Sequence, residues 1–224
     1  MRWRGSAVGQ IILSVLITVT GASGRTGRLV VAQLLAAGQE VRGIVRSEQR
    51  AAEVRAAGAS PVLGDLTTSD LPAVLAGSAA LVHNAAASNP TPGASDGVDN
   101  VATVALVSAA ARAGVQRVVQ VSSMYANRVA DGPSFLHDVL RSKSVSDAAL
   151  QDSSLLWTVV RPGGLVDEDA TDQVAVGAQL PSGRVSRADV ASVCVACLSE
   201  PRTECRAFDL TSGGTRVADA LRGL

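Results

Sequence analysis

The stretch VLITVTGASGRTGRLVVAQLL, residues Val15–Leu35, carries an apolar run into a helical pattern through three glycines spaced G-x-x-G-x-x-G. A strand-to-helix turn leaves the first helical N–H groups unpaired at the positive end of the helix dipole, where a pyrophosphate binds if no side chain obstructs it. Gly21 and Gly24 allow a tight turn and a close backbone approach, and Gly27 allows the helix to pack near the sheet. This context predicts a dinucleotide-binding turn.

Outward from the glycines, apolar strand-like runs alternate with helical patterns along most of the chain. The first strand is expected within 11–20, and the others at 40–46, 60–66, 79–86, 115–123, 155–162 and 205–211. Helices are expected between them, among them 98–113, 134–150 and 187–198. Near-continuous apolar strands separated by helices predict an α/β fold in which a doubly wound, mostly parallel sheet forms the middle of three layers.

Composition limits the class of protein. The sequence has 224 residues, 47% of them apolar and 2% aromatic, which predicts one domain over residues 11–224 with a core of small aliphatic side chains. Residues 1–10 are interpreted as a leader outside the domain. The apolar run after them is not interpreted as a signal peptide, because it reaches the glycines without a cleavage site, and it is too short to span a bilayer. Twenty basic and twenty acidic residues cancel, without a Lys/Arg block for nucleic acid. Three cysteines are too few for a disulfide framework, which favours the cytoplasm.

The end of the second expected strand, GIVRSEQR, indicates which dinucleotide would bind. An acidic residue there would bind the 2′-hydroxyl of NAD, but Arg46 occupies this position, with Ser47 and Arg50 nearby. A guanidinium suits a 2′-phosphate, and Arg25 inside the glycine turn adds a second positive contact, so NADP is favoured. The alternative is that both arginines are simply solvated. Asp65, after the third strand, either accepts a hydrogen bond from the adenine amine or starts the next helix.

Several segments together resemble the atypical short-chain dehydrogenase/reductases, closest to the NAD(P)H-binding proteins grouped with flavin/biliverdin reductases and to NmrA-like proteins. These segments are TGASGRTGR, GIVR, GDL, VQRVVQVSSM, LRSKSVSDAALQDSSLLWTVVRPGGL and VSRADVA, spread over residues 15–210. The resemblance implies a Rossmann fold with a nicotinamide cofactor over the carboxyl ends of the strands. It also implies cofactor contacts at the phosphates, the adenosine and the nicotinamide, from Gly21, Ser23, Gly24, Arg25, Thr26, Gly27, Arg46, Asp65, Leu66, Ala85, Ala86, Ser122, Lys143, Pro162 and Gly163.

One departure from the family pattern concerns proton transfer. Members that reduce carbonyls use a Tyr-x-x-x-Lys pair, in which the lysine lowers the tyrosine pKa and the tyrosine protonates the developing alkoxide. Lys143 matches the lysine and is expected at the ribose hydroxyls, but Val139 occupies the tyrosine position. Three proton sources stay open: water, Tyr125 in the loop after Ser122, and His137 at the start of the same helix. Ser122, at a strand end, is expected to bond a substrate oxygen.

Other polar residues give less specific signals. His83 and Asn84 end the fourth strand and either line the cleft or close the loop. Cys194 and Cys197 form C-x-x-C within an apolar helix, without a second Cys/His pair at ligand spacing, so we expect burial and no metal. Asp189 is expected to hold the start of that helix.

The combined expectation is an NADPH-dependent reductase that passes hydride to a flavin, a quinone or a carbonyl compound. Loops 85–97, 123–133 and 163–185 would frame the substrate cleft. Two alternatives are kept: an NmrA-type protein that binds the dinucleotide without turnover, and a redox-neutral isomerase or cyclase on the same scaffold. The chain is expected to be a monomer or homodimer that acts on a small molecule, with no nucleic-acid or membrane partner.

Overall fold

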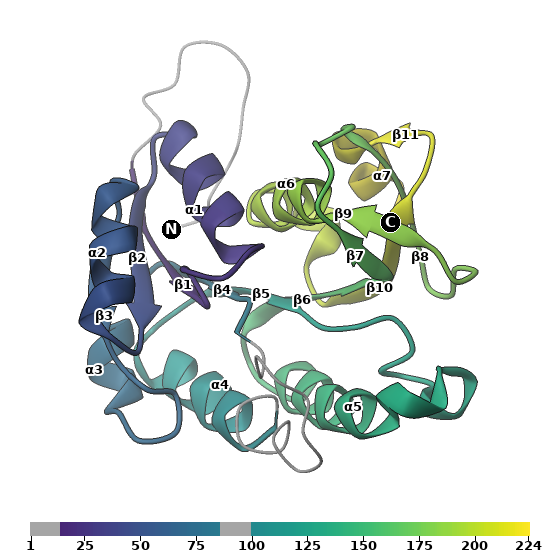
Figure 1. Cartoon of the computed structure of the whole chain (residues 1–224). Coiled ribbons are helices and arrows are strands. Elements are labelled where there is room, and N and C mark those ends of the chain that lie inside the picture. The colour runs from purple at the N-terminus through teal and green to yellow at the C-terminus, as the bar shows by residue number, and fades with distance from the viewer. Residues whose placement is uncertain (1–13, 86–99) are drawn as a thin grey trace.

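The computed structural model describes residues 14–85 and 100–224 (Figure 1). Within these residues nine strands form one sheet in the order β11-β8-β10-β6-β5-β4-β1-β2-β3. The strands are β1 (Leu16–Thr20), β2 (Glu40–Val45), β3 (Ser60–Leu63), β4 (Ala80–His83), β5 (Arg117–Val121), β6 (Leu156–Pro162), β8 (Gln173–Gly177), β10 (Arg206–Ser212) and β11 (Thr215–Arg216). Strand β8 is antiparallel to β10 and β11, and the other neighbours are parallel. The expected doubly wound, Rossmann-like sheet is confirmed.

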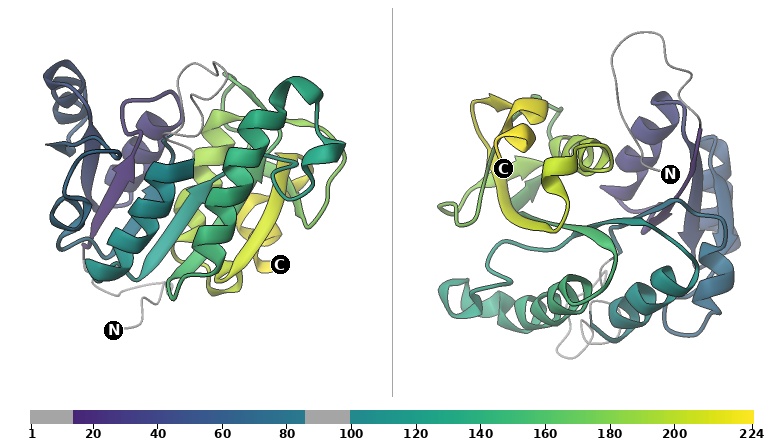
Figure 2. Two further views of the ribbon diagram at one scale, coloured as in Figure 1. Left: turned by 90° about the horizontal axis from the view of Figure 1, so that it is seen from below. Right: turned by 180° about the vertical axis from the view of Figure 1, so that it is seen from behind.

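Helices cover both faces of this sheet, which makes three layers (Figures 1 and 2). One face carries α1 (Gly27–Ala36), α2 (Glu48–Ala56), α6 (Arg187–Cys197) and α7 (Val217–Arg222), and the other carries α3 (Leu71–Leu75), α4 (Thr103–Arg112) and α5 (His137–Gln151). None of the described helices is long and apolar enough to cross a membrane. The expected leader 1–10, Ala86 and the loop 85–97 beyond Ala85 lie outside the described residues.

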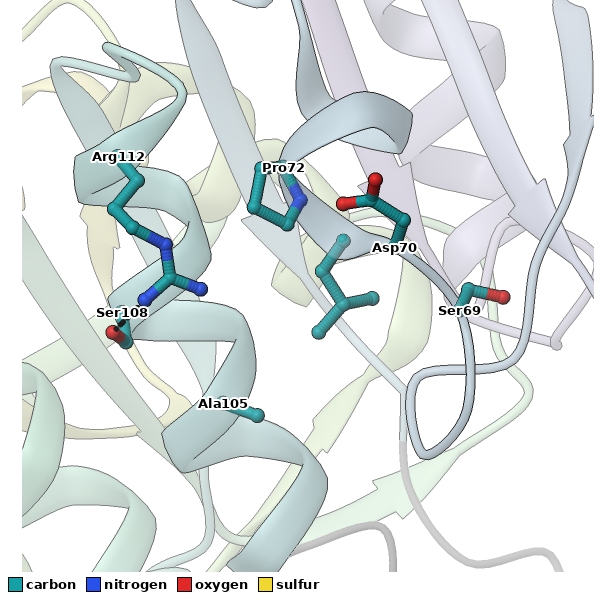
Figure 3. A pocket seen from close by; sticks show the side chains of 7 residues that line it. Ser69, Asp70, Pro72, Ala105, Ser108 and Arg112 are labelled. Atoms are coloured by element: carbon teal, nitrogen blue, oxygen red, sulfur yellow. Dashed lines mark hydrogen bonds between the residues drawn. The ribbon is translucent and has the colours of Figure 1, made fainter.

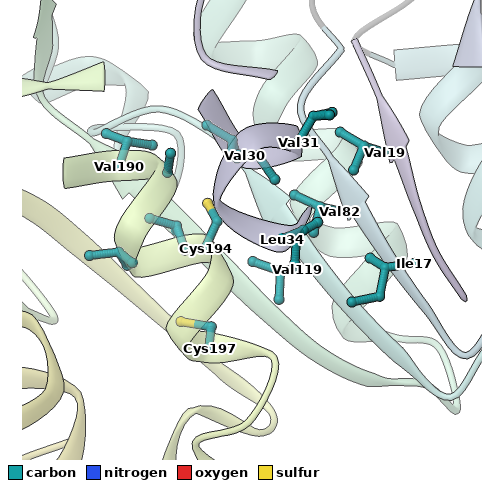
Figure 4. Packing of buried hydrophobic residues seen from close by; sticks show 14 of the residues in the cluster. Ile17, Val19, Val30, Val31, Leu34, Val82, Val119, Val190, Cys194 and Cys197 are labelled. Carbon is teal, nitrogen blue, oxygen red and sulfur yellow. The ribbon is translucent and has the colours of Figure 1, made fainter. Parts of the chain in front are cut away.

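The core on the α1 side is built from small aliphatic side chains (Figure 4). Ile17 and Val19 of β1 and Leu34 of α1 share one buried cluster with Cys194 and Cys197 of α6. Both thiols are fully buried, and burial raises the pKa of Cys197 to about 12. The two cysteines therefore pack as small apolar groups, as the helix pattern predicted.

Helix ends follow signals in the sequence. Gly38 and Gly114 end α1 and α4 with φ of +76° and +77°, a left-handed conformation that glycine adopts without a Cβ penalty. Ser186 caps α6: its hydroxyl accepts from the Asp189 backbone N–H and donates to the Asp189 carboxylate, both at 2.9 Å. The same carboxylate accepts from the Thr171 backbone N–H at 3.0 Å. Asp189 therefore holds the helix start, as expected, and the segment before it.

Two segments differ from the sequence-based expectation. The segment 163–185, expected to be irregular, contains β8 together with β7 (Gly164–Val166) and β9 (Arg184–Ser186), which pair as a separate two-stranded parallel sheet. Strands β7 and β9, with three residues each, are too short for periodicity to reveal. The helix expected from Ser134 starts with a 3-10 turn and becomes α-helical at His137.

Arg117, the first residue of the central strand β5, is buried at the amino end of that strand, while the glycine turn follows the carboxyl end of β1. It donates to the carbonyl oxygens of Leu156 and Cys197 and to the hydroxyls of Thr158 and Thr203. The Cys197 carbonyl lies at the end of α6, where the helix dipole is negative and attracts a cation. Arg117 therefore joins β5, β6 and α6 in one buried hydrogen-bond network.

Candidate active site

The glycine turn between β1 and α1 has no room for side chains. Gly21 has φ +65°, and a Cβ there would lie 2.8 Å from the Asn84 carbonyl oxygen. A Cβ on Gly27 would lie 2.0 Å from the Gly21 carbonyl oxygen, and one on Gly24 would lie 3.1 Å from the same atom. Ser23, between them, is half-buried. The turn thus lies against the ends of β1 and β4, the point of reversed strand order at which open α/β sheets bind ligands.

The start of α1 carries no competing carboxylate, and since the N–H groups of Arg28, Leu29 and Val30 already donate to backbone carbonyls, any N–H group offered to a ligand comes from the glycine turn itself. Thr26 precedes the helix without a side-chain cap, and no residue in this described turn is acidic. Arg25, expected at the phosphates, pairs with Asp167, with Nη1 2.9 Å from Oδ2 and both side chains mostly exposed. Arg187 binds the other oxygen of the same carboxylate at 2.9 Å. Asp167 therefore links the glycine turn to the segment 163–185.

His83, the last residue of β4, closes the junction with β1. Its ring is buried, with Nδ1 2.7 Å from Thr20 Oγ1 and Nε2 2.9 Å from Thr103 Oγ1. The Thr20 oxygen also accepts from the backbone N–H groups of the two residues that follow His83, so its own proton goes to Nδ1 and the ring proton lies on Nε2. Burial, and after it the charge of Lys143, lower the pKa of His83 to about 3. The ring is therefore neutral at pH 7.

The residues expected around the adenosine are in different environments. Arg46 is exposed at the end of β2. Asp65 accepts from the hydroxyl and the backbone N–H of Thr67 at 2.5 and 2.8 Å; these bonds, and after them the charge of Arg46, hold its pKa below the ordinary value. Ser47 caps α2, and Leu66 belongs to the core on the α3 side. Asp65 thus serves a local turn, while the guanidinium of Arg46 is in solvent.

The residues expected near the nicotinamide lie at the carboxyl ends of β5 and β6 and on α5. Ser122 directly follows β5 and is buried, as is Lys143 of α5. Lys143 lies near enough to His83 to lower the pKa of its ring. The Pro162 carbonyl, at the end of β6, accepts a backbone hydrogen bond from the loop after β5 at 2.9 Å. A Cβ on Gly163 would lie 2.3 Å from a backbone oxygen, so this turn is also tight.

Next to Ser122 is a buried ion pair that no sequence feature predicted. Arg161 Nε donates to Asp147 Oδ2 at 2.9 Å, and Gln120 Nε2 donates to Oδ1 at 2.8 Å. Burial raises the pKa of Asp147, while Arg161, Ser122 and Gln120 lower it. The Ser122 hydroxyl is near enough for this effect, yet its Oγ has no partner of hydrogen-bonding geometry among the described residues. A buried hydroxyl in this condition is suited to bond a ligand oxygen.

Of the two side chains considered as proton donors, Tyr125 lies in the loop after β5 and His137 is the first residue of α5. Tyr125 has φ +73°, and the guanidinium carbon of Arg128 lies 4.8 Å from its ring centroid. Arg128 Nη2 donates to Asp209 Oδ2 at 2.6 Å. His137 lies with Nε2 3.0 Å from the Gly132 carbonyl oxygen, to which a protonated Nε2 donates. His137 is therefore used to hold the end of this loop.

A groove of about 470 Å³ lies between α3 and α4, lined by none of the residues above (Figure 3). Asp70 caps α3 by accepting from the backbone N–H of Ala73, and Arg112 donates to Ser108 at 2.8 Å. Since these polar groups stabilise their own helices, the groove is a surface feature of the helix pair.

Comparison with known proteins agrees with this geometry. The NAD(P)H-binding family matches residues 21–201. The uncharacterized sugar epimerase YhfK of Bacillus subtilis is 35% identical over 217 residues, covering 93% of this chain and 99% of that protein. Sanguinarine reductase of Eschscholzia californica is 26% identical, with 92% of each chain covered.

Solved structures share the fold over nearly the whole chain. A protein of Bacillus halodurans described as an NAD-dependent epimerase/dehydratase has a TM-score of 0.89 at 28% identity, covering 94% of this chain and 100% of that one. The anaerobilin reductase ChuY of Escherichia coli is similar in fold, with a TM-score of 0.79 at 22% identity, covering 88% of this chain and 97% of its own. The resemblance to atypical short-chain dehydrogenase/reductases is thus confirmed, and the chain belongs to the NAD(P)H-binding family, among oxidoreductases and epimerases.

Proposed function

We propose that this chain is an NADPH-dependent reductase that transfers hydride to a small conjugated acceptor, such as a flavin, a quinone or a carbonyl compound. The observation that carries the proposal is the glycine turn at the β1–β4 junction. Added Cβ atoms at Gly21 and Gly27 would clash with backbone, so the turn offers N–H groups to a ligand without covering side chains. Reductases among the relatives support the same activity.

The residues at this junction fit a phosphorylated dinucleotide. The phosphates would lie against the glycine turn and the first turn of α1, with Ser23, Arg25 and Thr26 beside them. The exposed guanidinium of Arg46 suits a 2′-phosphate, for which an acidic residue would be repulsive. The adenine would lie near Asp65 and Leu66, and the ribose and nicotinamide near Ala85, Lys143, Pro162 and Gly163.

The bound nicotinamide supplies the hydride, and the chain's own residues bind the acceptor and manage its proton. Ser122 has a buried hydroxyl without a hydrogen-bond partner among the described residues, so it bonds an acceptor oxygen. Lys143 holds ribose hydroxyls, and Tyr125 lies on the acceptor side. The buried thiols of Cys194 and Cys197 and the exposed free thiol of Cys205 suit a reducing cytoplasm.

The test is titration of the purified protein with NADPH and with NADH, followed by addition of FMN or a small quinone while nicotinamide absorbance is recorded. We expect tight NADPH binding and acceptor-dependent oxidation. Arg46→Ala should weaken NADPH binding by about 10-fold or more and leave NADH binding nearly unchanged, because a charge-assisted bond to phosphate is worth about 1.5–3 kcal/mol. Arg55→Ala, at an exposed arginine of α2, is the matched control. Failure of the wild-type protein to bind either dinucleotide would refute the proposal.

A redox-neutral epimerase is the second candidate, favoured by the naming of YhfK as a sugar epimerase. Product formed with no net consumption of NADPH would support it. Binding of NADPH with neither oxidation nor product would instead support a cofactor-sensing protein. Val139 departs from the usual carbonyl reductase, whose Tyr-x-x-x-Lys pair has its proton donor at this position.

A further inference from the structure

We infer that Arg128 and Asp209 are positioning residues that fix Tyr125 as the acceptor-side proton donor, in place of the tyrosine that Val139 replaces. The inference rests on the proposed reductase function and deepens it. Arg128 and Asp209 are 81 residues apart, and no sequence pattern links them. Asp209 binds Arg128, and Arg128 in turn covers the ring of Tyr125, the one tyrosine in the sequence.

Asp209 is a buried carboxylate that joins two loops of the acceptor side. Its side chain is fully buried, and its Oδ2 accepts from Arg128 Nη2 at 2.6 Å and from the Leu180 backbone N–H at 3.1 Å. Arg128 belongs to the loop 123–133, and Leu180 to the connection between β8 and β9. A buried ion pair costs desolvation energy, so its presence between two loops points to a requirement for their geometry.

The place of this pair in the sheet brings it to the candidate active site. Asp209 of β10 is the register neighbour of Arg161 of β6, one residue before Pro162. The Pro162 carbonyl accepts from the Met124 backbone N–H at 2.9 Å, which places the residue before Tyr125 at the carboxyl end of β6. Ligands of open α/β sheets bind at these strand ends.

Tyr125 is held in a conformation that a bulky residue rarely adopts. Its φ is +73°, and strained backbone of this kind concentrates at functional sites. The guanidinium of Arg128 covers the ring at 4.8 Å. A Cβ on Gly132 would come within 3.1 Å of the Tyr125 Cβ and 2.6 Å of a Leu140 methyl carbon, so glycine at 132 leaves space for this tyrosine. The left-handed backbone of Tyr125, the guanidinium of Arg128 over its ring and the space left by Gly132 thus together define the position of this side chain.

The chemistry requires a proton as well as a hydride. The acceptor takes a hydride from the reduced dinucleotide, which is left oxidised, and the acceptor is left with a negative charge on oxygen or nitrogen. The Tyr125 O–H gives its proton to that atom, and the resulting phenolate recovers a proton from water. The positive charge of Arg128 beside the ring stabilises the phenolate in the interval.

The test compares Tyr125→Phe, Arg128→Gln, Asp209→Asn and the double variant Arg128→Gln/Asp209→Asn. Each should lower kcat/KM for a quinone by about 100-fold while the NADPH dissociation constant changes less than two-fold, since general acid catalysis contributes about 10²–10⁴-fold. Arg128→Gln alone should also lower the melting temperature, because it leaves the Asp209 charge buried and unpaired. Arg141→Gln, which breaks an exposed pair with Asp138, is the control and should behave as wild type.

The double variant separates positioning from mere structural support. Its melting temperature should recover, because no buried charge is left unpaired, while kcat/KM stays low. Recovery of kcat/KM together with stability would overturn the inference, as would wild-type kinetics in Tyr125→Phe.

A second readout applies if the wild-type protein binds NADPH but oxidises none, which would count against the proposed function. Hydrogen exchange with FMN as the probe should then show protection of 123–133 and 178–183 in the wild type. Asp209→Asn should lose that protection in both segments. Equal protection in wild type and variant would overturn the positioning role independently of turnover.

Discussion

Thr20 and His83 are register neighbours on the paired strands β1 and β4, and their side chains share a hydrogen bond of 2.7 Å between Oγ1 and Nδ1, directly before the glycine turn. The same threonine oxygen accepts from the backbone of residues 84 and 85, so the turn, the end of β4 and α4 all depend on a neutral imidazole. The buried ring thus performs a structural task next to the cofactor crevice.

Because the folded state keeps the His83 ring neutral, we expect the free energy of unfolding to fall in acid. Between pH 6.5 and about 3 the unfolded chain carries a proton on His83 that the folded chain does not, so the free energy of unfolding falls as pH decreases through that window. The loss from this group is about 1.4 kcal/mol per pH unit. Asp147 acts in the opposite direction, because its raised pKa lets the folded state take up a proton first.

Urea unfolding at pH 7.0 and pH 5.0 isolates the His83 contribution. His83→Gln should be less stable at pH 7.0 but should show a shallower decrease on acidification than wild type. His137→Gln, at the other histidine of the chain, is the control and should keep the wild-type slope. An unchanged slope in His83→Gln would show that other groups cause the acid sensitivity.

The clashes at Gly27 and Gly21 lead us to expect that alanine at either position strongly weakens NADPH binding. Gly27→Ala places a methyl group 2.0 Å from the Gly21 carbonyl oxygen, so the turn must open and NADPH affinity should fall by about 100-fold or more. Gly21→Ala adds strain at φ +65° to a 2.8 Å clash and should be as severe. Gly214→Ala, whose added carbon would have no atom of residues 14–85 or 100–224 within 4 Å, is the matched control. Fluorescence titration measures all three, and near-normal affinity in Gly27→Ala would contradict the tight turn.

We expect Asp167 to compete with the cofactor phosphates for Arg25. Its carboxylate pairs with Arg25 at 2.9 Å across the mouth of the glycine turn, in a pair exposed to solvent on both sides. Because an exposed ion pair is worth about 0.2–1 kcal/mol, Asp167→Asn should release Arg25 to the phosphates and tighten NADPH binding by about two- to five-fold. The effect should shrink as salt increases. Weaker binding in Asp167→Asn would mean that this carboxylate orients Arg25 toward the cofactor.

Replacement of Arg117, which lies away from the candidate active site, should strongly lower the stability of the fold. Arg117→Met removes a charged donor from the Leu156 and Cys197 carbonyls and from the Thr158 and Thr203 hydroxyls, although both hydroxyls keep the bonds that they donate and Cys197 still accepts from Thr203. We expect a decrease of about 3 kcal/mol in the free energy of unfolding, since several buried hydrogen bonds to a charged group are lost at about 1.5–3 kcal/mol each and removal of the buried charge offsets part of that loss. Urea denaturation measures it, with Arg112→Met on the surface of α4 as control. NADPH affinity of the folded variant should stay at the wild-type value.

The sequence was sufficient for the elements whose signals are local. The apolar runs of β1, β5 and β6 and the glycine stops at Gly38 and Gly114 depend on neighbouring residues alone, and they were predicted correctly. The segment 163–185 was not, because β7 and β9 have three residues each and their pairing depends on tertiary contacts.

The same distinction applies to the site. The glycine turn was recognisable from spacing, and the structure agrees with its tightness. The pairs Asp147–Arg161 and Arg128–Asp209 were not recognisable, because a buried charge and a solvated charge look alike in sequence. Arg128 and Asp209 are 81 residues apart, and no local pattern connects them.

The packing of α1 against α6 has a consequence for biosynthesis. Gln33 of α1 donates to Ser192 of α6 at 3.2 Å across 159 residues of sequence, and Leu34 shares its core with Leu221 near the end of the chain. The helix that carries the proposed phosphate site therefore stays uncovered on the ribosome until α6 and α7 have emerged. A nascent chain stalled after β6 would expose this apolar face to chaperones, and proteolytic removal of α6 would uncover it without removing any residue of the glycine turn.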